Sequence, residues 1–140
     1  MCIEMQIFEN NVIINKNTMQ LYTDKAIYYP QMKKVILIND VKMYDFNDSL
    51  FCDSLILYDQ DQKSFEAMKN VNFYKGSNKI KCENLKYETL FDTTKKLISI
   101  SNNAQIIDSL RIVKGDSIFI HYKDTIVEQI DIPANGEIIN

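Results

Sequence analysis

One short pattern recurs about every 30 residues, and this repeat constrains the fold more than any other feature of the sequence. It occurs in LYTDKAIYY, LFCDSLILY and IKCENLKYE, where an aliphatic residue lies three positions before an acid and apolar residues follow two and four positions after it. The acids are Asp24, Asp53 and Glu83, and a weaker copy carries Asp116; successive acids are 29, 30 and 33 residues apart. A fixed period of this length is typical of stacked structural units.

A second element repeats in the same phase. An Asn or Asp precedes Val12, Val41, Val71 and Ala104, in ENNVII, NDVKMY, KNVNFY and NNAQII. Each unit is therefore predicted to hold a strand with the acid, a polar turn, and a longer strand that ends at the Asn-Val step. The length of 140 residues predicts a single domain, with units at about residues 11–40, 41–70, 71–103 and 104–140.

The alternation of side chains predicts strands and a bend in each unit. Apolar residues recur at every second position, and Val, Ile, Phe, Tyr and Thr are frequent, as in half-buried strands. Leu21 and Ala26 are five positions apart, so both face the interior only where the strand bends or bulges between them. We interpret Asp24, Asp53 and Glu83 as corner residues in that interval. A catalytic carboxylate pair is the alternative, and the structural period favours corners.

Composition argues against several classes of protein. The net charge of −3 argues against a nucleic-acid partner, and no apolar run approaches the roughly 18 residues of a membrane-spanning helix. The amino terminus shows no signal peptide. There is no CxxC pair for zinc, no Gly-rich phosphate loop, and no partner near His121 for nucleophilic catalysis. We therefore expect no cofactor and no enzymatic activity.

Two of the three cysteines occupy the same position of the repeat. Cys52 and Cys82 each precede an acid. If another strand separates their strands, the two thiols are too far apart for a disulfide. We favour two buried, reduced thiols, and a disulfide remains the alternative.

The motifs resemble a known family. The segment LYTDKAIY, followed by VILINDVKMY and then by LFCDSLILY and another Asn-Val step, resembles the OstA-like family, the LptA and LptC group of periplasmic lipopolysaccharide-transport proteins. The resemblance covers Asn11 to about Ile107. The glycine that usually precedes the family's Asn-Val step is absent here, which affects only the expected local turn.

The resemblance implies an all-β fold, an elongated antiparallel β-jellyroll of stacked two-strand repeats that is open at its ends. It also implies a periplasmic location and an interior that carries the acyl chains of lipopolysaccharide or a related lipid. The terminal strands would join other Lpt-type jellyroll proteins, or further copies of this chain, end to end. The interior either closes as a dry core or parts to admit a lipid chain. The alternative function is a structural β-repeat scaffold that binds no lipid. The predicted inward, lipid-binding residues are Ala26, Tyr28, Val35, Leu37, Val41, Met43, Leu55, Leu57, Phe65, Val71, Phe73, Leu85, Tyr87 and Ile118.

Overall fold

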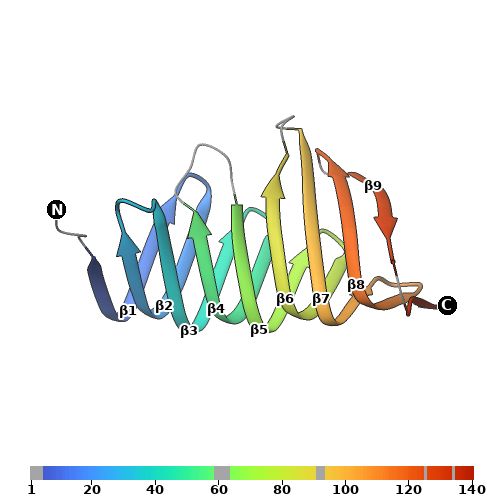
Figure 1. Cartoon of the computed structure of the whole chain (residues 1–140), viewed down its shortest axis with the longest axis horizontal. Coiled ribbons are helices and arrows are strands. Elements are labelled where there is room, and N and C mark those ends of the chain that lie inside the picture. The colour runs from blue at the N-terminus through green and yellow to red at the C-terminus, as the bar shows by residue number, and fades with distance from the viewer. Residues whose placement is uncertain (1–4, 59–63, 91–93, 125, 134) are drawn as a thin grey trace.

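The structure is a computed structural model that describes residues 5–58, 64–90, 94–124, 126–133 and 135–140. The regular elements in these ranges are all strands, as the sequence predicts (Figure 1). They are β1 (Gln6–Lys16), β2 (Met19–Tyr29), β3 (Lys34–Asp45), β4 (Asp48–Tyr58), β5 (Ser64–Lys75), β6 (Asn78–Thr89), β7 (Lys95–Ile107), β8 (Ile112–Lys123), β9 (Ile126–Asp131) and β10 (Glu137–Ile139).

The strands form one antiparallel sheet that does not close on itself. From β1 to β8 each strand pairs with its neighbours in the chain, so the order in the sheet is the order in the sequence. The outer edge of β8 is shared by two short strands: β9 pairs with the segment from Phe119 to Lys123, and β10 pairs with Ile112 to Lys114. The sheet therefore has a long free edge at β1 and an interrupted one at β9 and β10.

Each strand from β1 to β8 bends near its middle, along the lower edge of the view in Figure 1. At this level the pairing register shifts by one residue, and the extra residue always lies on β1, β3, β5 or β7. Two successive residues there have a positive φ angle, a conformation that Asn and Asp tolerate better than most residues. These pairs are Asn10 and Asn11, Asn39 and Asp40, Lys69 and Asn70, and Asn102 and Asn103.

The prediction that the longer strand ends at the Asn-Val step is wrong. β3 passes through Val41 and continues to Asp45, and β5 passes through Val71 and continues to Lys75. The physical reason is that the residues of positive φ redirect the chain while its pairing resumes directly afterwards. The Asn-Val step therefore marks the bend, and the chain reverses later, at turns such as the one between β3 and β4.

The corner interpretation of the acids is confirmed. The register shifts enclose all three acids on β2, β4 and β6, and Leu21 and Ala26 on either side of the first bend are both fully buried. Two of the acids bind the neighbouring bend: Asp53 Oδ2 accepts a hydrogen bond from Asn70 Nδ2 at 3.0 Å, and Glu83 Oε2 accepts one from the Asn70 backbone N–H at 3.1 Å. These acids therefore hold adjacent bends together.

The bends divide the sheet into two walls that face each other across an elongated trough. Phe65 and Phe73 lie on opposite sides of the bend in β5. Their rings are in edge-to-face contact with centroids 6.3 Å apart, so the two halves of this strand face one another. The first wall comprises residues 12–16, 19–23, 41–45, 48–52, 71–75, 78–82, 104–107 and 112–115; the second comprises 6–9, 25–29, 34–38, 54–58, 64–68, 84–89, 95–101 and 117–123.

Candidate functional site: the apolar trough

Aromatic rings fill the middle of the trough. The rings of Phe65 and Tyr87 stack in parallel with their centroids 5.0 Å apart, and Phe73 on the first wall contacts Phe65 edge to face. All three side chains are buried, as are Leu50 and Leu55 beside them. Buried side chains in contact with one another leave no space for a lipid chain unless they move.

The amino-terminal end of the trough is hollow. A cavity of about 340 Å³ lies there, lined by residues of β1, β2, β3 and β4. The residues that line this cavity are mostly apolar. Phe8 is one of them, and 49% of its surface is exposed. We call this cavity the amino-terminal mouth; the residues that shape its interior are Val12, Ile14, Ala26, Tyr28, Val35 and Leu57.

The carboxy-terminal end has a second cavity, of about 420 Å³. Apolar side chains from β7 to β10 line it, and Asp108 and Arg111 add a polar side. Asp108 accepts hydrogen bonds from the backbone N–H groups of Leu110 and Arg111, which lowers the pKa of its carboxyl group. Ile132 folds back over Gly115, where a Cβ atom would lie only 2.9 Å from the isoleucine methyl group. Ile132, with residues of β9 and β10, thus covers this end of the trough.

Two lysines join the walls across the open side of the trough, which we call the rim. Lys16 on the first wall donates a hydrogen bond to the Tyr58 carbonyl oxygen on the second, at 2.9 Å. Lys75 Nζ lies 5.3 Å from the centre of the Tyr122 ring on the second wall and 3.0 Å from an Asp48 carboxylate oxygen. In the described part of the chain, side-chain contacts of these two lysines therefore link the walls at the rim.

The phenol of Tyr122 and the two cysteine thiols inside the trough stay neutral near neutral pH. Burial raises the pKa of Tyr122 to about 12, and the negative charge of Asp48 adds to the effect. Burial likewise raises the pKa of the Cys52 and Cys82 thiols to about 12. Both cysteines are buried and free, and β5 lies between their strands. Protonated thiols are poor nucleophiles, so these groups act as small apolar side chains.

The structure places the fourteen predicted lipid-binding residues along this trough. Twelve are buried, while Tyr28 and Val35 are half-buried at the amino-terminal mouth. Sequence reasoning missed the part of the mouth that comes from β1, namely Phe8, Val12 and Ile14, although alternation in NNVIINK was a usable signal. It also missed the lysines of the rim.

The remaining sequence features to be placed are His121, possible metal-ligating clusters, membrane-spanning helices and Cys2. His121 Nε2 lies 3.0 Å from an Asp131 carboxylate oxygen on β9, a contact between strands at the surface. The part of the chain that the structure describes contains no cluster of three or more metal-ligating side chains. Within the same residues, no helix has the length and apolarity needed to cross a bilayer. Cys2 lies outside the described residues.

Comparison with known proteins gives the family. The sequence model of the family described as LptA/(LptD N-terminal domain) LPS transport protein matches residues 4–126, most of the chain. The chain belongs to this family. The predicted resemblance to OstA-like transport proteins is thereby confirmed, and the family is one of transport proteins. A search of curated proteins finds no match.

A solved structure shares the fold. The chain is similar to LptH from Pseudomonas aeruginosa, described as the LptA homologous periplasmic component of the conserved lipopolysaccharide transport device. The two share 13% of their residues, the TM-score is 0.70, and the match covers 87% of this chain and 94% of LptH. The similarity confirms an open antiparallel β-jellyroll.

Proposed function

We propose that the trough binds acyl chains of lipopolysaccharide, or of a related lipid, and that this chain bridges part of the route of that lipid through the periplasm. The family membership supports the transport role. The observation that carries the lipid site is the amino-terminal mouth, because the buried core residues Ala26 and Leu57 line an apolar cavity there. The proposed role is binding and transfer without catalysis.

The size of the mouth sets how much lipid it accepts at rest. Its volume of about 340 Å³ is in the lower part of the range for small-molecule sites. Each methylene group that leaves water contributes about 0.8 kcal/mol, so even a short length of acyl chain binds favourably. A longer segment requires Phe65, Phe73 and Tyr87 to part in the middle of the trough.

The rim gives the lipid headgroup a place outside the trough. A lipid with its acyl chain between the walls leaves its charged end at the open side, beside Lys16 and Lys75. Both lysines contact the opposite wall through their ammonium groups, so a negatively charged group that attracts these ammonium groups also loosens the rim. Acyl binding and rim opening are coupled in this arrangement.

The free edge of β1 provides the docking surface for a neighbouring jellyroll. This strand runs from Gln6 to Lys16, and it exposes Ile7 and Ile13. Pairing with a terminal strand of another Lpt-type protein, or of a second copy, would extend the sheet and the trough together.

A scaffold that binds no lipid is the second candidate. The stacked rings of Phe65 and Tyr87 favour it, because they fill the middle of the trough.

Photo-crosslinking distinguishes the two functions. A benzoylphenylalanine replaces Tyr28 in the mouth, and a matched probe replaces Lys86 on the outside of the second wall. With lipopolysaccharide present, we expect a lipid adduct at position 28 and none at position 86. A folded protein without an adduct at position 28 would support the scaffold.

A further inference from the structure

The outer face of the first wall carries a row of aromatic side chains. Tyr22, Tyr44, Phe51 and Tyr74 come from the successive strands β2 to β5, and consecutive ring centroids are 5.9, 6.0 and 6.1 Å apart. Each ring lies at a steep angle to the next, in edge-to-face contact. Lys79 on β6 continues the row, with its Nζ 5.4 Å from the centre of the Tyr74 ring.

This row lies on the side of the wall that faces away from the trough. Tyr44 and Tyr74 are each 38% exposed, whereas the residues that alternate with them, Met43 and Phe73, are buried in the core. The aromatic row therefore lies outside the hydrophobic core that holds the walls together. Aromatic residues with one apolar surface and one polar tip are typical of binding surfaces.

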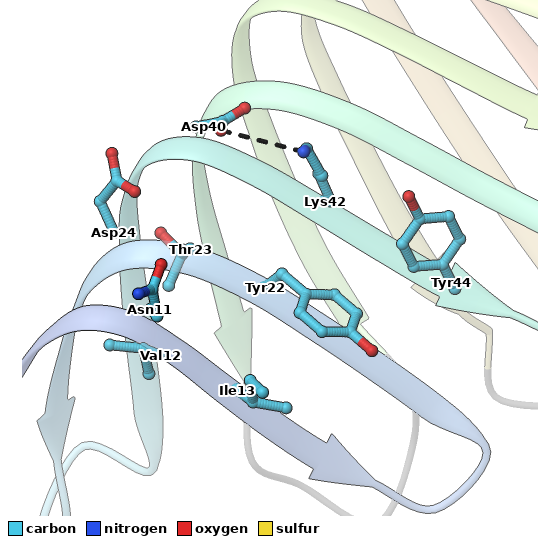
Figure 2. A pocket seen from close by; sticks show the side chains of 9 residues that line it. All are labelled: Asn11, Val12, Ile13, Tyr22, Thr23, Asp24, Asp40, Lys42 and Tyr44. Carbon is cyan, nitrogen blue, oxygen red and sulfur yellow. Dashed lines mark ion pairs between the residues drawn. The ribbon is translucent and has the colours of Figure 1, made fainter.

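The row begins at a hollow beside the bends of β1, β2 and β3 (Figure 2). The hollow has a volume of about 490 Å³. Figure 2 shows the rings of Tyr22 and Tyr44 toward one end, with Asp24, Asp40 and Lys42 nearer the bends. Lys42 Nζ lies 3.9 Å from an Asp40 carboxylate oxygen, so charges of both signs stand in the same small site.

This combination matches a neutral ligand rich in hydroxyl groups. A sugar ring presents C–H groups on its face, which pack on aromatic rings, and hydroxyl groups around its edge. Carboxylates accept hydrogen bonds from such hydroxyls and an ammonium group donates to them. Asp24, Asp40 and Lys42 together leave the hollow with one net negative charge, so a strongly anionic ligand is disfavoured, whereas hydroxyl groups meet both acceptors and a donor.

We propose that this face binds a linear oligosaccharide, with one sugar in the hollow between Asp24, Lys42 and Tyr44 and the following sugars along the row to Tyr74. The row runs across the strands, so the site is elongated along the length of the roll. It lies on the opposite side of the wall from the trough and does not depend on lipid binding there.

The test is titration of the full-length chain with saccharides that carry no lipid, followed by two-dimensional NMR. The probes are chitotetraose and cellotetraose, as free linear glycans, and the sugar portion released from lipopolysaccharide by mild acid. We expect chemical-shift changes around Tyr22, Tyr44 and Tyr74. Tyr44→Ala or Tyr74→Ala should weaken binding about fivefold to tenfold. The matched control is Tyr29→Ala, an aromatic on the second wall, which should leave the affinity unchanged.

The outcomes separate the sources of the sugar. Binding of chitotetraose or cellotetraose that depends on Tyr44 supports the site and identifies a free glycan as its ligand. Binding of the lipopolysaccharide sugar alone also supports the site, with the transported lipid as the source. Absence of binding by all three probes overturns the proposal and leaves a protein partner as the occupant of the row. Binding that survives both substitutions also overturns it. Circular dichroism of each variant verifies that the fold is intact.

Discussion

The amino-terminal mouth and the middle of the trough use equivalent positions of one repeat, yet one is hollow and the other is filled. Position 35 of β3 corresponds to position 65 of β5; the mouth has Val35 there and the middle has Phe65. On the neighbouring strands, Ala26 at the mouth corresponds to Leu55 in the middle. The backbone repeat sets the shape of the trough, while the end of the sheet at β1 and the smaller side chains of Ala26 and Val35 leave room for a ligand at the mouth.

The largest expected difference between these regions is in stability. Phe65→Ala removes a fully buried ring from the middle and should lower the free energy of unfolding by about 3–5 kcal/mol. Phe8→Ala at the mouth removes a half-exposed ring and should cost less than about 1 kcal/mol. Urea unfolding followed by circular dichroism measures both. Equal losses would show that the mouth is as tightly filled as the middle.

The next largest expected effect is a dependence of the free energy of unfolding on pH. The thiols of Cys52 and Cys82 have a folded pKa of about 12, raised from 9.0. Above pH 9 the unfolded thiols ionise while the folded ones stay protonated, so their stabilising contribution is complete below pH 9 and declines from there toward pH 12. Each thiol lowers the free energy of unfolding by up to about 1.4 kcal/mol per pH unit in this range.

Urea unfolding at pH 8, 9 and 10 tests this dependence. The control variant carries Cys52→Thr and Cys82→Thr, since Thr23 occupies the equivalent buried position on β2. This variant should lose about 3 kcal/mol less than the parent between pH 8 and pH 10, about 1.4 kcal/mol for each thiol. Parallel curves for the two proteins would mean that the thiols already reach solvent in the folded state.

The rim contacts should also differ between the two regions. Lys75→Met removes the ion-pair partner of Asp48, whose side chain is only 24% exposed. This change should lower the free energy of unfolding by about 2 kcal/mol. Lys16→Met at the mouth removes a hydrogen bond to a carbonyl group and should cost about 1 kcal/mol or less. Thermal unfolding of the two variants measures the difference. A larger loss for Lys16→Met would place the stronger rim contact at the mouth.

Val35→Phe should have the smallest effect on stability. It is also the most specific test of the difference between the mouth and the middle of the trough. This change gives the mouth the residue of the middle, and because Val35 is half-buried beside a cavity it should alter stability by less than about 1 kcal/mol. Crosslinking of lipopolysaccharide at position 28 should fall about fivefold, because the added ring occupies the space for the acyl chain. Unchanged crosslinking would show that the lipid does not use this cavity.

The sequence was sufficient for the features that depend on alternation along a single strand. The interior position of residues such as Leu37 and Leu85, and the bend between Leu21 and Ala26, follow from counting positions. Contacts between the walls were not predictable, because Lys16 and Tyr58 are 42 residues apart and meet only through the angle of the bends. The outer aromatic row was missed for a similar reason. Tyr22 and Phe51 become part of one row only once the strand register is known.

The pairing of each strand with its neighbour in the chain has a consequence for folding kinetics. From β1 to β8, few residues lie between the end of one strand and the start of its hydrogen-bonded partner, so the loops that must close are small even though the protein is all-β. Hairpins in any part of the chain can form first and then add strands on either side. We therefore expect faster folding than is usual for β-sandwiches, with β10, which pairs with the distant end of β8, docking last.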